Sequence, residues 1–187
     1  MDRMSSRNFT SGFTLLELLI AMALIVLLLK LAVPALQALL HGSRMRTEAH
    51  RLMGAINLAR SEAVLRKGPV SLCPSQIATT GISQCGGTYA GGWLVFYDEN
   101  RDRIVDAGSD EVLQVFAALP SGYSLTNRDG SRQLKETISY LPDGTSRSNR
   151  TLLLCTPPGI DLEPLAIVIN IVGRPRVARG WGQCLKA

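Results

Sequence analysis

Four basic side chains near the carboxyl end of the chain are the residues best suited to bind an anion. Residues 173–187 contain Arg174, Arg176, Arg179 and Lys186 and no aspartate or glutamate, which gives this tail a charge of +4. Guanidinium groups form bidentate hydrogen bonds with phosphate oxygens, and clustered basic charge attracts polyanions and anionic lipids. The alternative is a solvated tail that only keeps the protein soluble.

The spacing of the arginines and three further residues affect the conformation of this tail. Arg174 and Arg176 are two positions apart, so in an extended segment their side chains share one face. Gly173 ends an apolar run, while Pro175 stiffens the chain and disfavours further strand pairing. Trp181 has two interpretations: its ring stacks on an exposed base, or it clamps the tail by packing.

An acidic stretch is the second candidate site. It runs from Asp98 to Asp106 with the pattern D-x-N-x-D-x-x-x-D, and oxygen ligands at alternate positions can hold calcium. However, an EF-hand loop has glycine at its sixth position and glutamate at its twelfth, where this chain has Arg103 and Ser109. Arg101 also places positive charge inside the stretch, so the sequence favours a polar hairpin turn over a calcium site. The residues with candidate ligand oxygens are Asp98, Asn100, Asp102 and Asp106.

Four cysteines predict disulfides, because an even number is typical of proteins in an oxidising compartment. Four cysteines allow three pairings. We favour Cys73 with Cys85, which closes a short glycine-rich loop, and Cys155 with Cys184, which ties down the C-terminus. A zinc site is disfavoured because the chain has no CxxC motif and its histidines lie far from the cysteines in sequence.

No enzyme motif is present in the sequence. The two histidines, His41 and His50, lie in a predicted helix, and the serine and acidic residues show no nucleophile motif. The chain also lacks a phosphate-binding glycine loop. The sequence therefore predicts a protein that is not an enzyme and that uses neither a cofactor nor a metal.

The elements that must position these residues begin with an apolar segment. Residues 13–33 carry two charged residues, one of them Glu17, and are long enough to span a bilayer as a helix. Arg3 and Arg7 precede the segment, so the positive-inside rule places the N-terminus in the cytoplasm and the rest of the chain outside. Gly12 lies before the apolar run, so cleavage there removes a leader and keeps the helix.

A charged residue such as Glu17 is costly in a membrane and therefore needs a partner. Cleavage after Gly12 creates a new amino group on Phe13, about one helical turn from Glu17. In a low-dielectric setting the carboxylate pairs strongly with that cation, on its own chain or on a neighbouring subunit.

Beyond the span the pattern becomes amphipathic and then changes to β. Apolar residues at three- and four-residue spacings between Met45 and Ala63 predict that the helix continues to about Lys67, where Gly68 and Pro69 stop it. Short apolar and alternating runs then predict seven strands. The predicted strands are residues 70–73, 93–97, 112–116, 123–125, 137–141, 151–155 and 165–172.

The stretch GFTLLE, which runs from Gly12 to Glu17, resembles the processing motif of type IV pilins and type II secretion pseudopilins. The resemblance implies that a prepilin peptidase cuts after Gly12 and methylates the new terminal Phe13. It also implies that Glu17 helps dock the subunit into a fibre of other major and minor pilins.

Later segments resemble the GspH/FimT branch of this family. LARSEA at residues 58–63 and VSLC at residues 70–73 resemble the end of the long helix and the first strand of that branch. GWLVFYDEN at residues 92–100 resembles its central hairpin. The branch contains pseudopilin H of secretion systems and minor pilins of type IV pili.

The GRPR stretch that begins at Gly173 resembles the GRxR motif in the C-terminal tail of FimT-type minor pilins. Those proteins are implicated in DNA uptake during natural transformation. The resemblance implies that Arg174 and Arg176 contact DNA, and the nearby charges of Arg179 and Lys186 extend this predicted DNA-binding set.

These patterns together predict an α+β protein with the type IV pilin fold. The predicted parts are a leader (1–12), a transmembrane helix (13–36), its amphipathic continuation (37–67) and a β-rich head (68–187) that ends in the basic tail (173–187). We expect a single-pass inner-membrane protein with a periplasmic head that is incorporated into an extracellular pilus. The predicted function is a minor pilin that binds DNA non-specifically and assists its uptake. The alternative is a minor pilin that initiates pilus assembly, or type II secretion pseudopilin H, without DNA binding.

Overall fold

A computed structural model describes residues 14–106 and 108–184 of the chain. Five residues singled out in the sequence lie outside the described residues: Arg3, Arg7, Gly12, Phe13 and Lys186. The chain divides into two compact units, Met1–Leu40 and His41–Ala187.

One continuous helix, α1 (Leu15–Arg66), contains both the apolar and the amphipathic segment. In its first part, up to Leu40, the large apolar side chains are exposed, and the helix is long and apolar enough to cross a membrane. A helix satisfies its own backbone hydrogen bonds, so such a segment can lie in lipid. The predicted long N-terminal helix is therefore confirmed.

From Met45 onward, α1 presents one narrow apolar face to the head. The buried residues recur every three or four positions, as the sequence predicts, and four of the seven are alanines. Alanine has the smallest apolar side chain that still favours a helix, so the sheets can approach the helix axis closely. The buried residues of the helix are Met45, Ala49, Leu52, Ala55, Ile56, Ala59 and Ala63.

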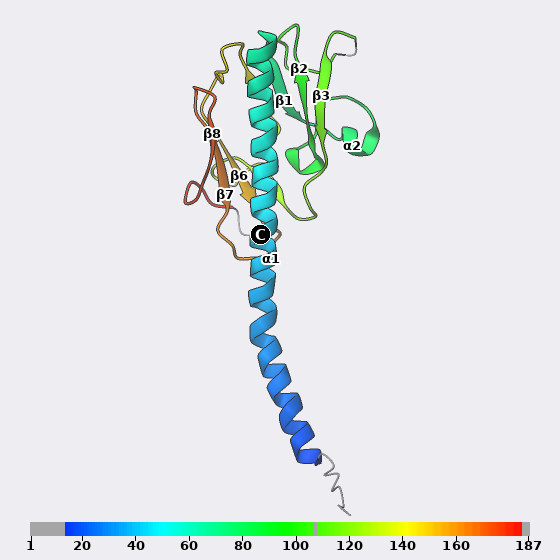
Figure 1. Ribbon diagram of the computed structural model, residues 1–187, viewed down its shortest axis with the longest axis vertical. Coiled ribbons are helices and arrows are strands. Elements are labelled where there is room, and N and C mark those ends of the chain that lie inside the picture. Colours follow the sequence, from blue (N-terminus) through cyan, green and yellow to red (C-terminus); the bar gives the residue numbers. More distant parts are fainter. Residues whose placement is uncertain (1–13, 107, 185–187) are drawn as a thin grey trace, which may run out of the picture. The chain divides into compact units, whose positions relative to one another are not determined.

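Within the described residues the head contains two four-stranded antiparallel sheets, on either side of α1 (Figure 1). The first sheet has the order β3-β2-β1-β5, and the second has the order β4-β6-β7-β8. The strands of the first sheet are β1 (Val70–Pro74), β2 (Trp93–Tyr97), β3 (Glu111–Phe116) and β5 (Ile138–Tyr140). Those of the second are β4 (Ser124–Thr126), β6 (Arg150–Cys155), β7 (Leu165–Ile169) and β8 (Pro175–Ala178).

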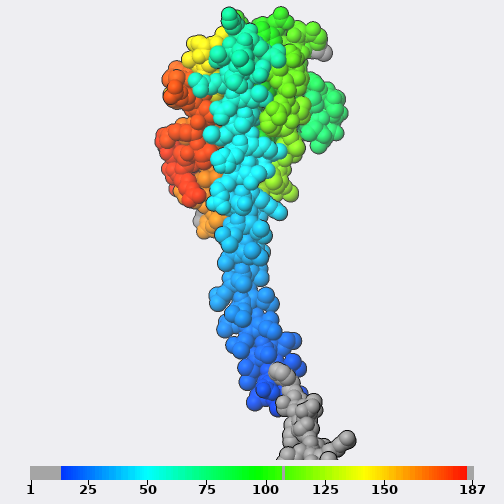
Figure 2. Space-filling model, viewed as in Figure 1, coloured from blue at the N-terminus to red at the C-terminus, as the bar shows by residue number. Residues whose placement is uncertain are grey.

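A single apolar core joins the helix to both sheets. Ile56 of α1, Leu72 and Trp93 of the first sheet, and Leu152 and Ile167 of the second sheet all belong to it and are almost fully buried. The opposite surface of α1 remains exposed along the head (Figure 2). The two sheets thus hold the helix between them without enclosing it.

The second sheet also has a smaller apolar cluster on the face turned away from the core. Its buried members are Leu153, Cys155 and Ala166, which alternate along β6 and β7 with the residues that face α1. We call this group the outer cluster. Its partly buried members are Val168, Trp181 and Cys184.

All seven predicted strands form, but the last one ends earlier than predicted. Residues 165–172 were predicted as one strand, whereas β7 ends at Ile169 and the tail then adds the unpredicted strand β8. The prediction that Pro175 disfavours pairing is wrong, because Pro175 pairs with Ile169 as the first residue of an edge strand. Proline is tolerated at that position because an edge strand leaves some of its N–H groups unpaired. Two short helices, α2 (Ile77–Thr80) and η1 (Tyr89–Gly91), interrupt the loop predicted between β1 and β2.

Candidate functional site

A tight turn before β8 sets the position of the first tail arginine. The Gly173 N–H donates to the Asn170 carbonyl oxygen at 2.8 Å, and the Arg174 N–H donates to Asn170 Oδ1 at 2.9 Å. Arg174 therefore lies just before β8, with its side chain exposed. The extended segment that the sequence predicts for Arg174 and Arg176 begins only at Pro175.

Gly173 is required by the geometry of this turn. Its φ of +81° lies in the left-handed region, and a Cβ atom there would collide with the Gly144 carbonyl oxygen and the Tyr140 ring. The same carbonyl oxygen accepts a hydrogen bond from Arg60 Nε of α1 at 3.0 Å. The glycine of the GRPR stretch thus lets the turn approach the β5–β6 loop closely.

Replacing Gly173 by alanine is expected to destabilise the head more than replacing Gly180 does. Both glycines have positive φ, but a Cβ at Gly180 meets open space. Gly180→Ala should therefore cost about 1–2 kcal/mol for the backbone conformation alone, and Gly173→Ala should cost a further 1–3 kcal/mol for the collision. Urea unfolding of both variants measures the difference. Equal losses of stability would contradict the close approach to Gly144.

Arg176 lies within β8 on the outer face of the second sheet. It pairs directly with Val168 of β7, and paired residues in an antiparallel sheet point to the same side. Val168 belongs to the outer cluster, so Arg176 shares its face. The Arg176 guanidinium carbon lies 4.5 Å from the centroid of the Trp181 ring and over its face, which is a cation–π contact.

Trp181 follows β8 and folds back onto the same face. Its half-buried ring packs against the outer cluster. A second guanidinium, that of Arg128 in the β4–β5 loop, lies 5.8 Å from the ring centroid. Of the two interpretations of Trp181, the geometry favours the clamp that packs the tail onto the sheet.

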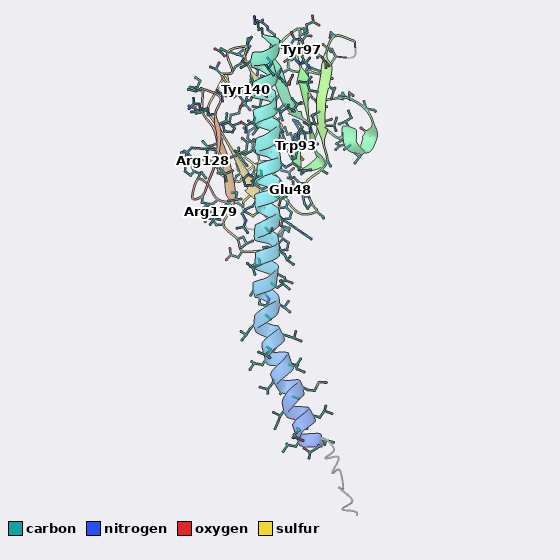
Figure 3. The ribbon with its side chains drawn as sticks, viewed as in Figure 1. Glu48, Trp93, Tyr97, Arg128, Tyr140 and Arg179 are labelled. Atoms are coloured by element: carbon teal, nitrogen blue, oxygen red, sulfur yellow. A yellow bond between two sulfur atoms is a disulfide. The ribbon has the colours of Figure 1, made fainter. Side chains whose placement is uncertain are left out.

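Arg128 is the residue of this site that sequence reasoning missed. It lies in a turn within the β4–β5 loop, far from the tail in sequence, and nothing in its neighbours marks it as functional. Arg128 and Arg179 lie on the same flank of the head, beside β7 and β8 (Figure 3). Arg128, Arg174, Arg176 and Arg179 are exposed, and none of them forms an ion pair with a described carboxylate.

Both favoured cysteine pairings are confirmed. Cys73 is bonded to Cys85 with their Cα atoms 5.6 Å apart, and Cys155 is bonded to Cys184 at 5.9 Å. Neither pair is available to bind zinc. The Cys155–Cys184 disulfide joins β6 to the end of the tail, within the same outer cluster that holds Trp181.

The acidic stretch forms the β2–β3 hairpin loop, and its carboxylates accept hydrogen bonds from the loop and from β1. Asn100 Nδ2 donates to Asp102 at 3.0 Å and to Asp106 at 2.8 Å. Asp98 accepts from the Ser71 hydroxyl and from the Arg103 N–H, and its burial raises the pKa of the carboxyl group. Among the described residues no group of three histidine, cysteine, aspartate or glutamate side chains has the arrangement of a metal site.

The first turn of α1 gives Glu17 a role that sequence reasoning also missed. Glu17 Oε2 accepts hydrogen bonds from the Thr14 N–H at 3.0 Å and from its hydroxyl at 3.1 Å, while the Thr14 hydroxyl accepts from the Glu17 N–H at 3.2 Å. This reciprocal pattern is a capping box, and its sequence signature is a threonine followed three residues later by glutamate. The signature is present in TLLE at residues 14–17.

A long apolar N-terminal helix whose second part packs on antiparallel sheets defines a protein of the type IV pilin class. Residues 7–29 match the prokaryotic N-terminal methylation motif, and residues 48–173 match the family described as type II transport protein GspH. The chain belongs to the GspH family of pilin-like proteins. The family match ends at Gly173, so the arginines of β8 and its flanks lie beyond it.

Known proteins of the same class resemble the chain along most of its length. Pilin-like protein PilA1 of Thermus thermophilus is 31% identical over 160 residues, which cover 84% of this chain and 83% of the relative. The type IV minor pilin FimU of Pseudomonas aeruginosa aligns with a TM-score of 0.52 at 16% identity over 73% of this chain and 89% of its own. The minor pseudopilin EpsH of the Vibrio cholerae type 2 secretion system aligns with a TM-score of 0.50 at 14% identity over 73% of this chain and 97% of its own.

Proposed function

We propose that this protein is a minor type IV pilin that binds extracellular DNA and assists its uptake in natural transformation. One observation carries the proposal: the exposed Arg174, Arg176 and Arg179 lie in and beside β8, the exposed Arg128 contacts the same Trp181 ring as Arg176, and none of these four forms an ion pair with a described carboxylate. A surface of unpaired guanidinium groups suits a partner with many phosphates.

The binding mechanism is electrostatic. Arg174, Arg176 and Arg179 each replace a counterion at a DNA phosphate, and phosphate contacts carry no base sequence information. Affinity therefore depends little on sequence and falls steeply with salt. The protein holds the DNA, and retraction of the pilus does the work of uptake.

The N-terminal helix would place this surface outside the cytoplasm. In this proposal prepilin peptidase cuts after Gly12 and methylates Phe13, and α1 holds the subunit in the inner membrane with its head in the periplasm. Glu17 then docks the subunit among other pilins. The exposed apolar side chains of α1 before Leu40 support this arrangement, because they need either lipid or neighbouring helices to cover them.

Loss of two arginines is expected to weaken DNA binding at least tenfold at low salt. With three or four phosphate contacts, affinity for duplex DNA should fall roughly 40- to 150-fold between about 50 mM and 200 mM salt. Arg174→Gln with Arg176→Gln removes two contacts and should lower the slope of log affinity against log salt by about 1.8. Fluorescence anisotropy of labelled duplex DNA with the full-length chain in neutral detergent measures both quantities.

Arg101→Gln with Arg103→Gln is the matched control, because it removes the same charge from the β2–β3 loop on the other sheet. If both double variants weakened DNA binding equally, the DNA would be attracted to the net charge of the head and not to a specific site on it. In cells, the tail variant should lose transformation and keep its pili. Reduced piliation with normal transformation would favour the assembly role without DNA binding.

A further inference from the structure

In the folded tail, two guanidinium groups and apolar side chains already contact the Trp181 ring. The Arg176 guanidinium lies 4.5 Å from its centroid and that of Arg128 lies 5.8 Å away, each over the ring. The ring also packs on the outer cluster of Leu153 and Ala166. Stacking with a base would require the ring to give up these contacts.

The rest of the described chain supplies no other aromatic platform near the tail. Tyr89, Trp93, Phe96, Tyr123 and Tyr140 are all buried. The partly exposed Tyr97 and Phe116 belong to β2 and β3, in the other sheet. Proteins that bind single strands without sequence preference rely on such platforms for about 1–3 kcal/mol per stacked base.

The two guanidinium groups on Trp181 are instead arranged to meet phosphates. A guanidinium that lies over an aromatic ring keeps its N–H edge free for bidentate hydrogen bonds. The guanidinium carbons of Arg128 and Arg176 lie 5.8 Å and 4.5 Å from the same ring centroid. These two carbons are therefore at most about 10 Å apart. Duplex DNA carries one charge per about 1.7 Å of its axis, so that distance faces several phosphates.

We propose that the site binds the backbone of duplex DNA and is built from two segments: the tail with Arg174 and Arg176, and the β4–β5 loop with Arg128. Trp181 is a positioning residue that holds Arg128 and Arg176 side by side and keeps bases out. This inference rests on the proposed function and specifies its substrate as double-stranded DNA. Because the two arginines are already ordered on the ring, they lose less conformational freedom when DNA binds.

Competition between DNA forms tests the substrate class. The full-length chain in neutral detergent is titrated with labelled duplex DNA and with a thymine single strand of the same length, at the same salt. We expect the duplex to bind more tightly because its charge density is higher. A preference for the single strand that disappears in Trp181→Leu would overturn the inference, since it would show stacking of bases on Trp181.

Variants test the two-segment site. Arg128→Gln should weaken duplex binding several-fold and lower the salt slope by about 0.9, whereas the single control variant Arg101→Gln should not. Trp181→Leu removes no charge yet should also weaken duplex binding, and Trp181→Phe should restore part of it. If Trp181→Leu fails to fold, the Arg128→Gln variant still tests the two-segment site, and the competition between duplex and single-stranded DNA still tests the substrate class.

The outcomes separate this inference from the proposed function. If the wild type binds no DNA, both fail. If Arg174→Gln with Arg176→Gln abolishes binding while Arg128→Gln behaves like Arg101→Gln, the proposed function stands and the two-segment site is wrong.

Discussion

Replacing Glu17 by alanine is expected to leave the protein in the membrane but to remove it from fibres. The substitution makes the first turn of α1 more apolar, so insertion persists. In the proposed assembly, however, the processed amino group of Phe13 loses its carboxylate partner in an apolar setting. Breaking such a buried pair costs about 3–5 kcal/mol, which corresponds to at least a hundredfold loss of incorporation.

Two further variants separate the docking role of Glu17 from its role in the capping box. Glu17→Gln keeps a side chain that can cap the helix but removes the charge, so it should fail to assemble as alanine does. Thr14→Ala removes the hydroxyl that bonds Glu17 but leaves the charge, and should cost only about 1 kcal/mol of helix stability. Immunoblots of sheared fibres and of membranes measure incorporation. Normal incorporation of Glu17→Gln would show that Glu17 serves the helix cap alone.

The elements of this fold follow from local patterns, and the sequence therefore predicted them well. The helix has a narrow buried stripe at helical spacing, and β2 and β3 pair on either side of the polar hairpin turn that the sequence favours for the acidic stretch. The sequence did not predict β8, because a proline such as Pro175 generally disfavours strand pairing. Proline is tolerated in a strand at the edge of a sheet. Only the completed strand order shows that residues 175–178 lie at an edge.

The composition of the candidate site was only partly predictable. The tail arginines are close in sequence, so their types and spacing reveal them directly. Arg128 joins them only because the end of the tail folds over the second sheet and brings Trp181 to the β4–β5 loop. The role of Trp181 also depends on how the tail folds. The sequence of the tail is the same whether the Trp181 ring is packed or free, so the sequence cannot distinguish the two roles.

The Cys155–Cys184 disulfide is expected to be as important to the proposed DNA site as the arginines are. Its two cysteines are 29 positions apart, and a loop of that size stabilises a fold by about 3–4 kcal/mol in the chain-entropy model. Cys155→Ala with Cys184→Ala should therefore destabilise the head by about that amount. It should also release Trp181 from the outer cluster, so that Arg176 and Arg128 are no longer held together.

The other disulfide provides a matched comparison. Cys73 and Cys85 are 12 positions apart, so their replacement by alanine should cost a similar amount, about 3 kcal/mol. That pair lies in a separate apolar cluster with Leu94 and Phe96, which is distinct from the outer cluster. The two double variants should therefore differ little in stability and strongly in the behaviour of the tail.

Limited trypsin digestion and DNA binding measure this difference. Cleavage after Arg176 and Arg179 should become at least tenfold faster in Cys155→Ala with Cys184→Ala, and duplex binding should weaken although every arginine is still present. Cys73→Ala with Cys85→Ala should leave both properties close to those of the wild type. Equal cleavage rates in the two variants would show that the pairing of β8 with β7 is enough to hold the tail without the disulfide. A faster rate only in the first variant would show that the disulfide and the ring of Trp181 hold the arginines in place.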